Sequence, residues 1–181
     1  MPVIEARGVS HRYGGGADGG AGRQVLDGID VLLQERRIGI VGANGSGKST
    51  FARMLNGLVL PTAGAVSIDG RDTRKEGREV RRRVGFCFTD PDAQIVMPTV
   101  AEDVAFGLRR RGLSKATIRA RVDAILTAYG LDTHADHPAH LLSGGQKQLL
   151  ALASVLVTEP DLLVMDEPTT LLDLRNAMMI S

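Results

Sequence analysis

The sequence predicts an α/β fold built around a phosphate-binding loop, and three observations support this prediction. Residues 42–50 read GANGSGKST and match the pattern G-x-x-x-x-G-K-[ST] in full. A strand-like apolar run precedes this motif and a helix-like run follows it, which is the context that a phosphate loop requires. A later apolar run, residues 162–165, ends in Asp166-Glu167, as a buried parallel strand does when it delivers carboxylates to a sheet edge.

Length and composition are those of one globular domain and exclude several functions. The chain has 181 residues, of which 43% are hydrophobic and 24% charged. Aromatic residues make up 3% and the net charge is +1, so nothing favours binding to nucleic acid. The single cysteine, Cys87, lies in an apolar run and is expected to be a core residue. We expect no signal peptide, and the longest apolar run, 149–157, is too short to cross a bilayer, so a membrane role would need a partner.

The first half of the chain is expected to form a small antiparallel sheet beside the phosphate loop. The glycine-rich stretch 14–22 is interpreted as a surface insertion between two strands, because such loops are tolerated at small cost. Asn56-Gly57 is a stop signal for the helix that follows the loop. Strands are expected over 3–13, 25–33, 38–41 and 65–69, and the third of these is expected to be buried.

A basic segment follows, over residues 71–83. Anionic lipid or an acidic loop of a partner is one interpretation of its seven Lys and Arg residues. We favour a solvated face, because Glu76 and Glu79 are interspersed and weaken any patch of one sign.

The middle of the chain predicts a helical insertion after a strand over 84–88. Thr99-Val-Ala-Glu102 is a capping box, so a helix is expected from about Val100 to Arg110. Ser114 is expected to start a second helix, and Gly130 is expected to stop it. That helix has an apolar face formed by Ile118, Val122, Ile125, Leu126 and Tyr129.

The residue types of the phosphate loop suit the binding of a triphosphate. Glycines let backbone N–H groups approach phosphate oxygens, and the following helix presents its positive end to the same anion. Lys48 can supply a charge for the outer phosphates and the Ser49 hydroxyl can ligate Mg²⁺. The candidate phosphate-binding residues are Gly42, Asn44, Gly45, Gly47, Lys48, Ser49 and Thr50.

Two later motifs add further chemistry. Ser143-Gly144-Gly145 leads into an apolar helix expected over 146–157 and predicts a second backbone anion site at a helix N-terminus. Asp166 is placed to hold Mg²⁺ through water, and Glu167 is placed to polarise the attacking water.

The three motifs, in this order, resemble the nucleotide-binding subunit of ABC transporters. Leu142-Ser-Gly-Gly-Gln146 matches the signature motif of that family, and the resemblance covers nearly the whole chain. It implies a P-loop NTPase fold with a RecA-like parallel core, a small antiparallel β-subdomain and an inserted helical subdomain over about 92–144. The whole chain, 1–181, would then be one ATP-binding domain that is incomplete at its C-terminus.

The resemblance also implies a composite site for ATP and Mg²⁺. ATP would lie between the phosphate loop of one subunit and the signature of a second ATPase subunit, identical or different. Tyr13 falls at the position of the adenine-stacking aromatic residue, and Asp173 matches the acid of the D-loop, which reports nucleotide state across the dimer. The signature residues are Ser143, Gly144, Gly145 and Gln146.

A narrower resemblance concerns the transported solute. Residues 88–95 and 99–107 look like the energy-coupling-factor branch of importers for vitamins and for cobalt or nickel ions. Residues 35–38, 72–75 and 169–176 look most like the ATPase of the biotin system, with a cobalt or nickel ATPase as the close alternative. This implies an ATP-hydrolysing subunit that lies on the cytoplasmic face of the inner membrane and binds an integral-membrane partner.

The chain departs from the family pattern at two places. Thr89 stands where the family usually has the Gln that senses the γ-phosphate and Mg²⁺, so Thr89 or Gln94 would contact the ion. No histidine follows the acid pair, whereas the family carries a switch histidine beyond the D-loop. We therefore expect that Ser181 marks a truncation, and the alternative function is a nucleotide-binding remnant with little or no ATPase activity.

Overall fold

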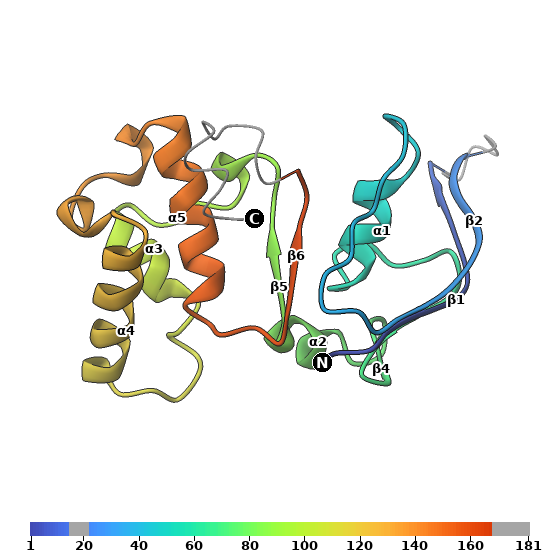
Figure 1. The fold of residues 1–181 in the computed structure, drawn as a ribbon, viewed down its shortest axis with the longest axis horizontal. Coiled ribbons are helices and arrows are strands. Elements are labelled where there is room, and N and C mark those ends of the chain that lie inside the picture. The colour runs from blue at the N-terminus through green and yellow to red at the C-terminus, as the bar shows by residue number, and fades with distance from the viewer. Residues whose placement is uncertain (15–21, 168–181) are drawn as a thin grey trace. The chain divides into compact units, whose positions relative to one another are not determined.

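The computed structural model describes residues 1–14 and 22–167, and residues 15–21 and 168–181 lie outside that description. The chain folds as two compact units, Met1–Val84 and Gly85 onward. Figure 1 shows their secondary structure, and each unit is described by itself.

The first unit is organised by a four-stranded antiparallel sheet with the strand order β2-β1-β3-β4. The strands are β1 (Ile4–Tyr13), β2 (Arg23–Leu33), β3 (Ala63–Ile68) and β4 (Arg71–Asp72). In the central strand, Ile4 lies opposite Leu33 of β2 and Ile68 of β3. Alternate residues of the same strand are buried, as period-two patterning requires. The expected antiparallel subdomain is confirmed.

The helix after the phosphate loop, α1 (Lys48–Met54), buries Phe51, Ala52 and Met54. The strand predicted over 38–41 is wrong: these residues have no strand structure, and Val41 is 92% exposed. A strand is stable only when a neighbour satisfies its backbone groups. No strand among the described residues pairs with this segment, so its apolar pattern alone did not make it a strand.

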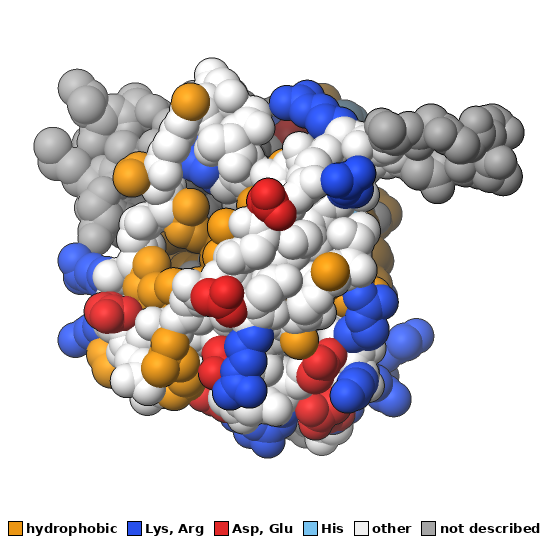
Figure 2. Space-filling view, turned by 90° about the vertical axis from the view of Figure 1, so that its right-hand side faces the viewer, with side chains coloured by type: hydrophobic (Ala, Val, Ile, Leu, Met, Phe, Trp, Pro, Cys, Tyr) orange, Lys and Arg blue, Asp and Glu red, His pale blue; other side chains and the backbone are white. Residues whose placement is uncertain are grey.

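The basic segment forms β4 and the short helix α2 (Gly77–Arg83), whose only buried side chain is Val80. Its basic side chains pair with nearby carboxylates: Arg82 Nη1 lies 3.5 Å from Glu79 Oε1, and Arg83 Nη1 lies 3.7 Å from Asp69 Oδ2. On the face shown in Figure 2, acidic and basic side chains are likewise interspersed. The segment therefore has the mixed, solvated character that its sequence predicted.

The second unit contains the parallel pair β5 (Val84–Cys87) and β6 (Leu162–Met165), which lie side by side in Figure 1. The Asp166 N–H donates to the Cys87 carbonyl at 3.0 Å and prolongs the pairing past the end of β6. Cys87 is buried, as expected, and burial raises the pKa of its thiol to about 11.

Helices fill the connection between β5 and β6. They are η1 (Pro91–Ala93), α3 (Val100–Phe106), α4 (Lys115–Ala128), η2 (Asp132–His134), η3 (Ala139–Leu141) and α5 (Gly144–Leu156). The capping box predicted at Thr99 is present, and Ser114 caps α4 as predicted. The expected extension of α3 to Arg110 is wrong. Hydrogen bonds from Leu108 N to Ala105 O and from Arg111 N to Leu108 O replace the α-helical spacing there.

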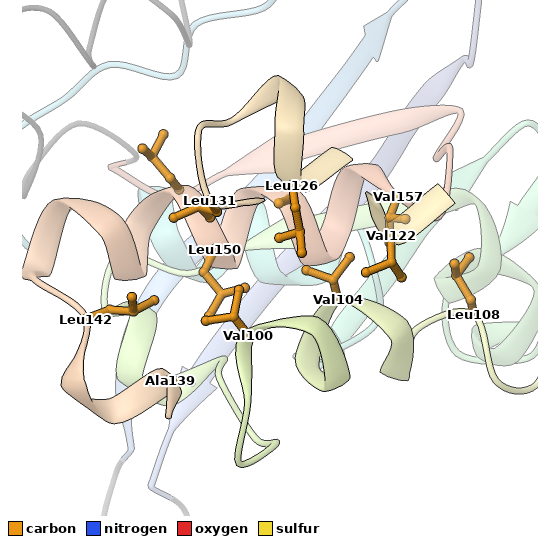
Figure 3. Packing of buried hydrophobic residues seen from close by; sticks show 12 residues of the cluster. Val100, Val104, Leu108, Val122, Leu126, Leu131, Ala139, Leu142, Leu150 and Val157 are labelled. Carbon is orange, nitrogen blue, oxygen red and sulfur yellow. The ribbon is translucent and has the colours of Figure 1, made fainter. Parts of the chain in front are cut away.

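A shared apolar core holds α3, α4 and α5 together (Figure 3). Val104 of α3, Leu126 of α4 and Leu150 of α5 all belong to it, and the predicted apolar face of α4 packs against it. Asp103 is the buried carboxylate of this region. It accepts hydrogen bonds from Val96 N at 2.8 Å, Met97 N at 3.0 Å and Ser154 Oγ at 2.9 Å, so the charge is compensated.

Within residues 1–14 and 22–167, no helix combines the length and the apolar character that crossing a bilayer would require.

Truncating the core of the second unit should reveal how much it contributes to stability. Leu150 is fully buried, so Leu150→Ala should lower the free energy of unfolding by about 2–5 kcal/mol, through lost burial and the cavity left behind. Leu141→Ala is the matched control, because Leu141 is 72% exposed and its truncation should change stability by less than about 0.5 kcal/mol. Denaturant unfolding measures both values, and equal losses would contradict the assigned packing.

Candidate nucleotide-binding site

The phosphate loop depends on glycine at the point where it enters α1. Gly47 caps this helix with a φ of 94°, in the left-handed region that favours glycine. A Cβ at this position would lie 2.7 Å from Leu26 Cδ2 and 2.9 Å from the Val25 carbonyl oxygen. The start of α1 is therefore pressed against β2, whereas residues 42–46 of the loop are exposed.

Lys48 lies folded over this loop. Its Nζ donates to the Gly42 carbonyl at 2.9 Å and to the Ala43 carbonyl at 3.0 Å. A carbonyl oxygen is a neutral acceptor, whereas a phosphate oxygen would form a stronger, charge-assisted bond with the same ammonium group. The lysine is thus held within reach of the space that a phosphate chain would fill, and the residues present fit a nucleoside triphosphate.

Tyr13 reaches the same helix from the sheet. Its hydroxyl lies 3.2 Å from Thr50 Oγ1, and the His11 ring meets its ring edge to face, with centroids 4.5 Å apart. Tyr13 is 45% exposed, so part of its ring is available for stacking. Tyr13, Lys48, Ser49 and Thr50 belong to the same unit as the phosphate loop.

The acid pair lies in the second unit, directly after β6. Asp166 is buried, whereas Glu167 is exposed. Glu167 adopts a φ of 52°, a conformation that costs free energy for any residue with a Cβ and is concentrated at functional sites. Thr89 Oγ1 donates to the Asp166 carbonyl at 2.8 Å, so Thr89 lies beside the acid pair.

Gln94 serves a different contact. Its Oε1 accepts from Phe88 N at 3.1 Å, and its Nε2 donates to the Ala151 carbonyl of α5 at 2.6 Å. Lys147 Nζ strengthens the same attachment through a 2.7 Å ion pair with Asp92 Oδ1. Gln94 therefore ties the segment after β5 to α5. Of the two predicted ion contacts, Thr89 is the one that touches the acid pair.

The signature motif forms the start of α5. The helix begins at Gly144, two residues before the predicted start, because Ser143 is its N-cap. Ser143 N donates to Gln146 Oε1 at 2.9 Å, and Gln146 N donates to Ser143 Oγ at 3.3 Å, which completes a capping box. The open N–H groups of such a first turn suit an anion.

The candidate site thus consists of two groups. Tyr13 and the phosphate loop belong to the first unit, whereas Thr89, Gln94, residues 143–146 and the acid pair belong to the second. Asp173 lies outside the described residues.

Sequence reasoning missed two contacts to the site. One is the bond between Tyr13 and Thr50, and the other is the 3.2 Å contact between His134 Nε2 and Gln146 Nε2. Both are tertiary contacts between residues 37 and 12 positions apart, and no local pattern marks them.

Comparison with known proteins shows which family the chain resembles. The model of the family described as "ABC transporter" matches residues 27–170. A putative ABC transporter ATP-binding protein of Deinococcus radiodurans is 56% identical over 96% of this chain and 74% of its own length. The biotin transport ATP-binding protein BioM of Rhizobium etli is 51% identical over 87% and 70%. The energy-coupling factor transporter ATP-binding protein EcfA1 of Symbiobacterium thermophilum is 52% identical over 95% and 62%.

Solved structures give the same fold. The ATP-binding cassette MJ0796, a dimer in a post-hydrolysis state bound to ADP and Pi, superposes with a TM-score of 0.85 at 30% identity. The match covers 98% of this chain and 79% of that one. CbiO1 of Clostridium perfringens, part of the ABC transporter complex cbiONQ, superposes with a TM-score of 0.79 at 35% identity, over 98% and 70% of the two chains.

Replacing the glycine that caps α1 should damage both stability and binding. We expect Gly47→Ala to cost about 1–2 kcal/mol for the left-handed backbone and about 1–3 kcal/mol more for the clash with β2. Binding of ATP, measured by calorimetry, should be lost. Gly112→Ala is the control: Gly112 has a φ of 72° and open space around it, so only the backbone cost should appear and ATP binding should persist. The same loss of ATP binding in both variants would refute the role of this contact.

Proposed function

This chain belongs to the ABC transporter family of ATP-binding proteins, and we propose that it is the energy-coupling ATPase subunit of a membrane importer. The observation that carries the proposal is the preformed phosphate loop. Residues 42–46 of the loop are exposed, and within the described residues Lys48 Nζ donates to two neutral carbonyls, which phosphate oxygens can replace.

The residues of the first unit bind the nucleotide. Backbone N–H groups at Gly45 and Gly47 and the ammonium group of Lys48 hold the phosphates, while the ring of Tyr13 stacks on adenine. Ser49 lies in the first turn of α1, where its hydroxyl is a hard oxygen donor for Mg²⁺.

The residues of the second unit carry the hydrolytic chemistry. Asp166 is a carboxylate that would hold Mg²⁺, and the hydrogen bond from Thr89 fixes the backbone of Asp166. When bound, Mg²⁺ neutralises charge on the phosphates. Glu167 acts as the general base: its exposed carboxylate orients a water molecule and accepts its proton.

A second ATPase subunit, identical or different, completes the site. Ser143, Gly144, Gly145 and Gln146 present the N-terminus of α5 to the phosphates bound by the other subunit. Asp173 would report nucleotide state across the same interface.

The importer's integral-membrane subunit docks on the second unit. Two large apolar side chains, Val96 and Phe106, are exposed along the segment from Thr89 to Phe106. This contact would hold the protein at the cytoplasmic face of the membrane and would transmit closure of the ATPase dimer to the partner. The solute is biotin, as the name of the Rhizobium etli relative suggests, or alternatively a transition-metal ion such as cobalt.

The alternative, a nucleotide-binding remnant with little or no ATPase activity, gains no support from the relatives over the importer subunit. A measurement of ATP turnover by the full chain distinguishes the two.

Removing the proposed general base should separate binding from hydrolysis. Glu167→Gln keeps the size of the side chain but cannot accept a proton, so phosphate release should fall by about 10²–10⁴-fold while ATP still binds. The chain supplies a closely matched control in Glu159→Gln, since Glu159 is also exposed and also has a φ of 52°. Its turnover should match that of the unaltered protein. Unchanged turnover in Glu167→Gln would remove this residue from the mechanism.

A further inference from the structure

Tyr13 is joined to the phosphate-binding helix by a single hydroxyl pair. Its OH lies 3.2 Å from the Oγ1 of Thr50, which is the third residue of α1 and follows Lys48 by two positions. Thr50 is 8% exposed, and its hydroxyl pairs with that of Tyr13. A bond formed in such an enclosed place is shielded from competing water.

A second contact restrains the plane of the same ring. The His11 ring lies 4.5 Å from the Tyr13 ring with an interplanar angle of 82°. His11 is 8% exposed, and within the described residues neither of its ring nitrogens has a hydrogen-bond partner. Its role at this position is therefore one of shape: it supports Tyr13 edge to face.

The strand β2 provides a common base for these groups. Tyr13 lies opposite Arg23 in the β1–β2 pair, and Gly47 packs against Val25 and Leu26 of the same strand. The main chain of Tyr13 and the start of α1 are thus both anchored on β2. The tilt of the Tyr13 ring is then decided by its side-chain contacts, of which the hydroxyl bond is the directional one.

We propose that the Tyr13 hydroxyl is a positioning group that couples base stacking to the phosphate loop. Its bond to Thr50 holds the ring in place before nucleotide arrives, so that one rigid assembly receives both the base and the phosphates. The inference rests on the proposed function, because it deepens the role given there to the Tyr13 ring. It predicts that affinity for the base, and not for the phosphates, depends on one oxygen atom.

The test compares two ligands on the full chain by calorimetry. Tyr13→Phe keeps the ring and removes the hydroxyl, so affinity for ATP should fall by about 2- to 12-fold, the equivalent of one net hydrogen bond. Affinity for inorganic tripolyphosphate, which has no base, should not change. Tyr129→Phe, which alters the other tyrosine, at the C-cap of α4, should leave both affinities unchanged.

A double-mutant cycle identifies the partner of the hydroxyl. Thr50→Val removes the other half of the bond at almost constant shape, and adding Tyr13→Phe to it should cause no further loss of ATP affinity. Independent, additive losses would overturn the proposal, as would equal ATP affinities of Tyr13→Phe and the unaltered protein. A parallel loss of tripolyphosphate binding in Tyr13→Phe would overturn it too, because general damage to the loop would explain the effect.

Failure of the proposed function would look different. In that case the unaltered protein would not bind ATP, or Lys48→Ala would bind ATP as well as the unaltered protein does. A protein that binds ATP through Lys48 but is indifferent to the Tyr13 hydroxyl retains the proposed function and loses only the coupling.

Discussion

The close approach between Gly47 and β2 is the constraint on which the first unit depends. The helix α1 begins so near Val25 and Leu26 that no side chain fits between them, and the backbone must adopt a left-handed conformation to start the helix there. This contact sets where Lys48 and Thr50 lie relative to the sheet. The phosphate loop is therefore shaped by a strand that precedes it in sequence, and its glycines serve packing as well as access for the ligand.

In the second unit, hydrogen bonds from side chains to backbone groups position the candidate site residues. Gln94 joins the chain after β5 to α5, and Thr89 joins it to the residue that follows β6. Asp103 fastens the start of the helical region through two backbone N–H groups and Ser154. Side chains that bridge main-chain groups hold their partners in one geometry, because both ends of each bridge are directional. The acid pair and the signature turn are consequently positioned by one connected network.

Sequence patterns between near neighbours predicted several local features correctly. Features that depend on residues distant in the sequence were not predicted. The capping box at Thr99 involves residues three positions apart and was predicted from the sequence, whereas the one at Ser143, with the same spacing, was not. The segment 38–41 has the composition of a buried strand, but a strand requires neighbours that its own residues do not specify. The bond of Tyr13 to Thr50 belongs to the same class. The motif identified the chemistry of the loop, while the fold decides which side chains support it.

The backbone at Glu167 has a consequence for how this protein can change over time. A residue with a Cβ is held there in a left-handed conformation that glycine would adopt without strain. Glycine at this position would lower the conformational free energy of the turn after β6. It would also remove the carboxylate that the proposed function requires. Under the proposed function, Glu167 keeps its carboxylate at this cost in stability. If hydrolysis were no longer required, replacement of Glu167 by glycine would be favoured because it relieves the strain of the backbone.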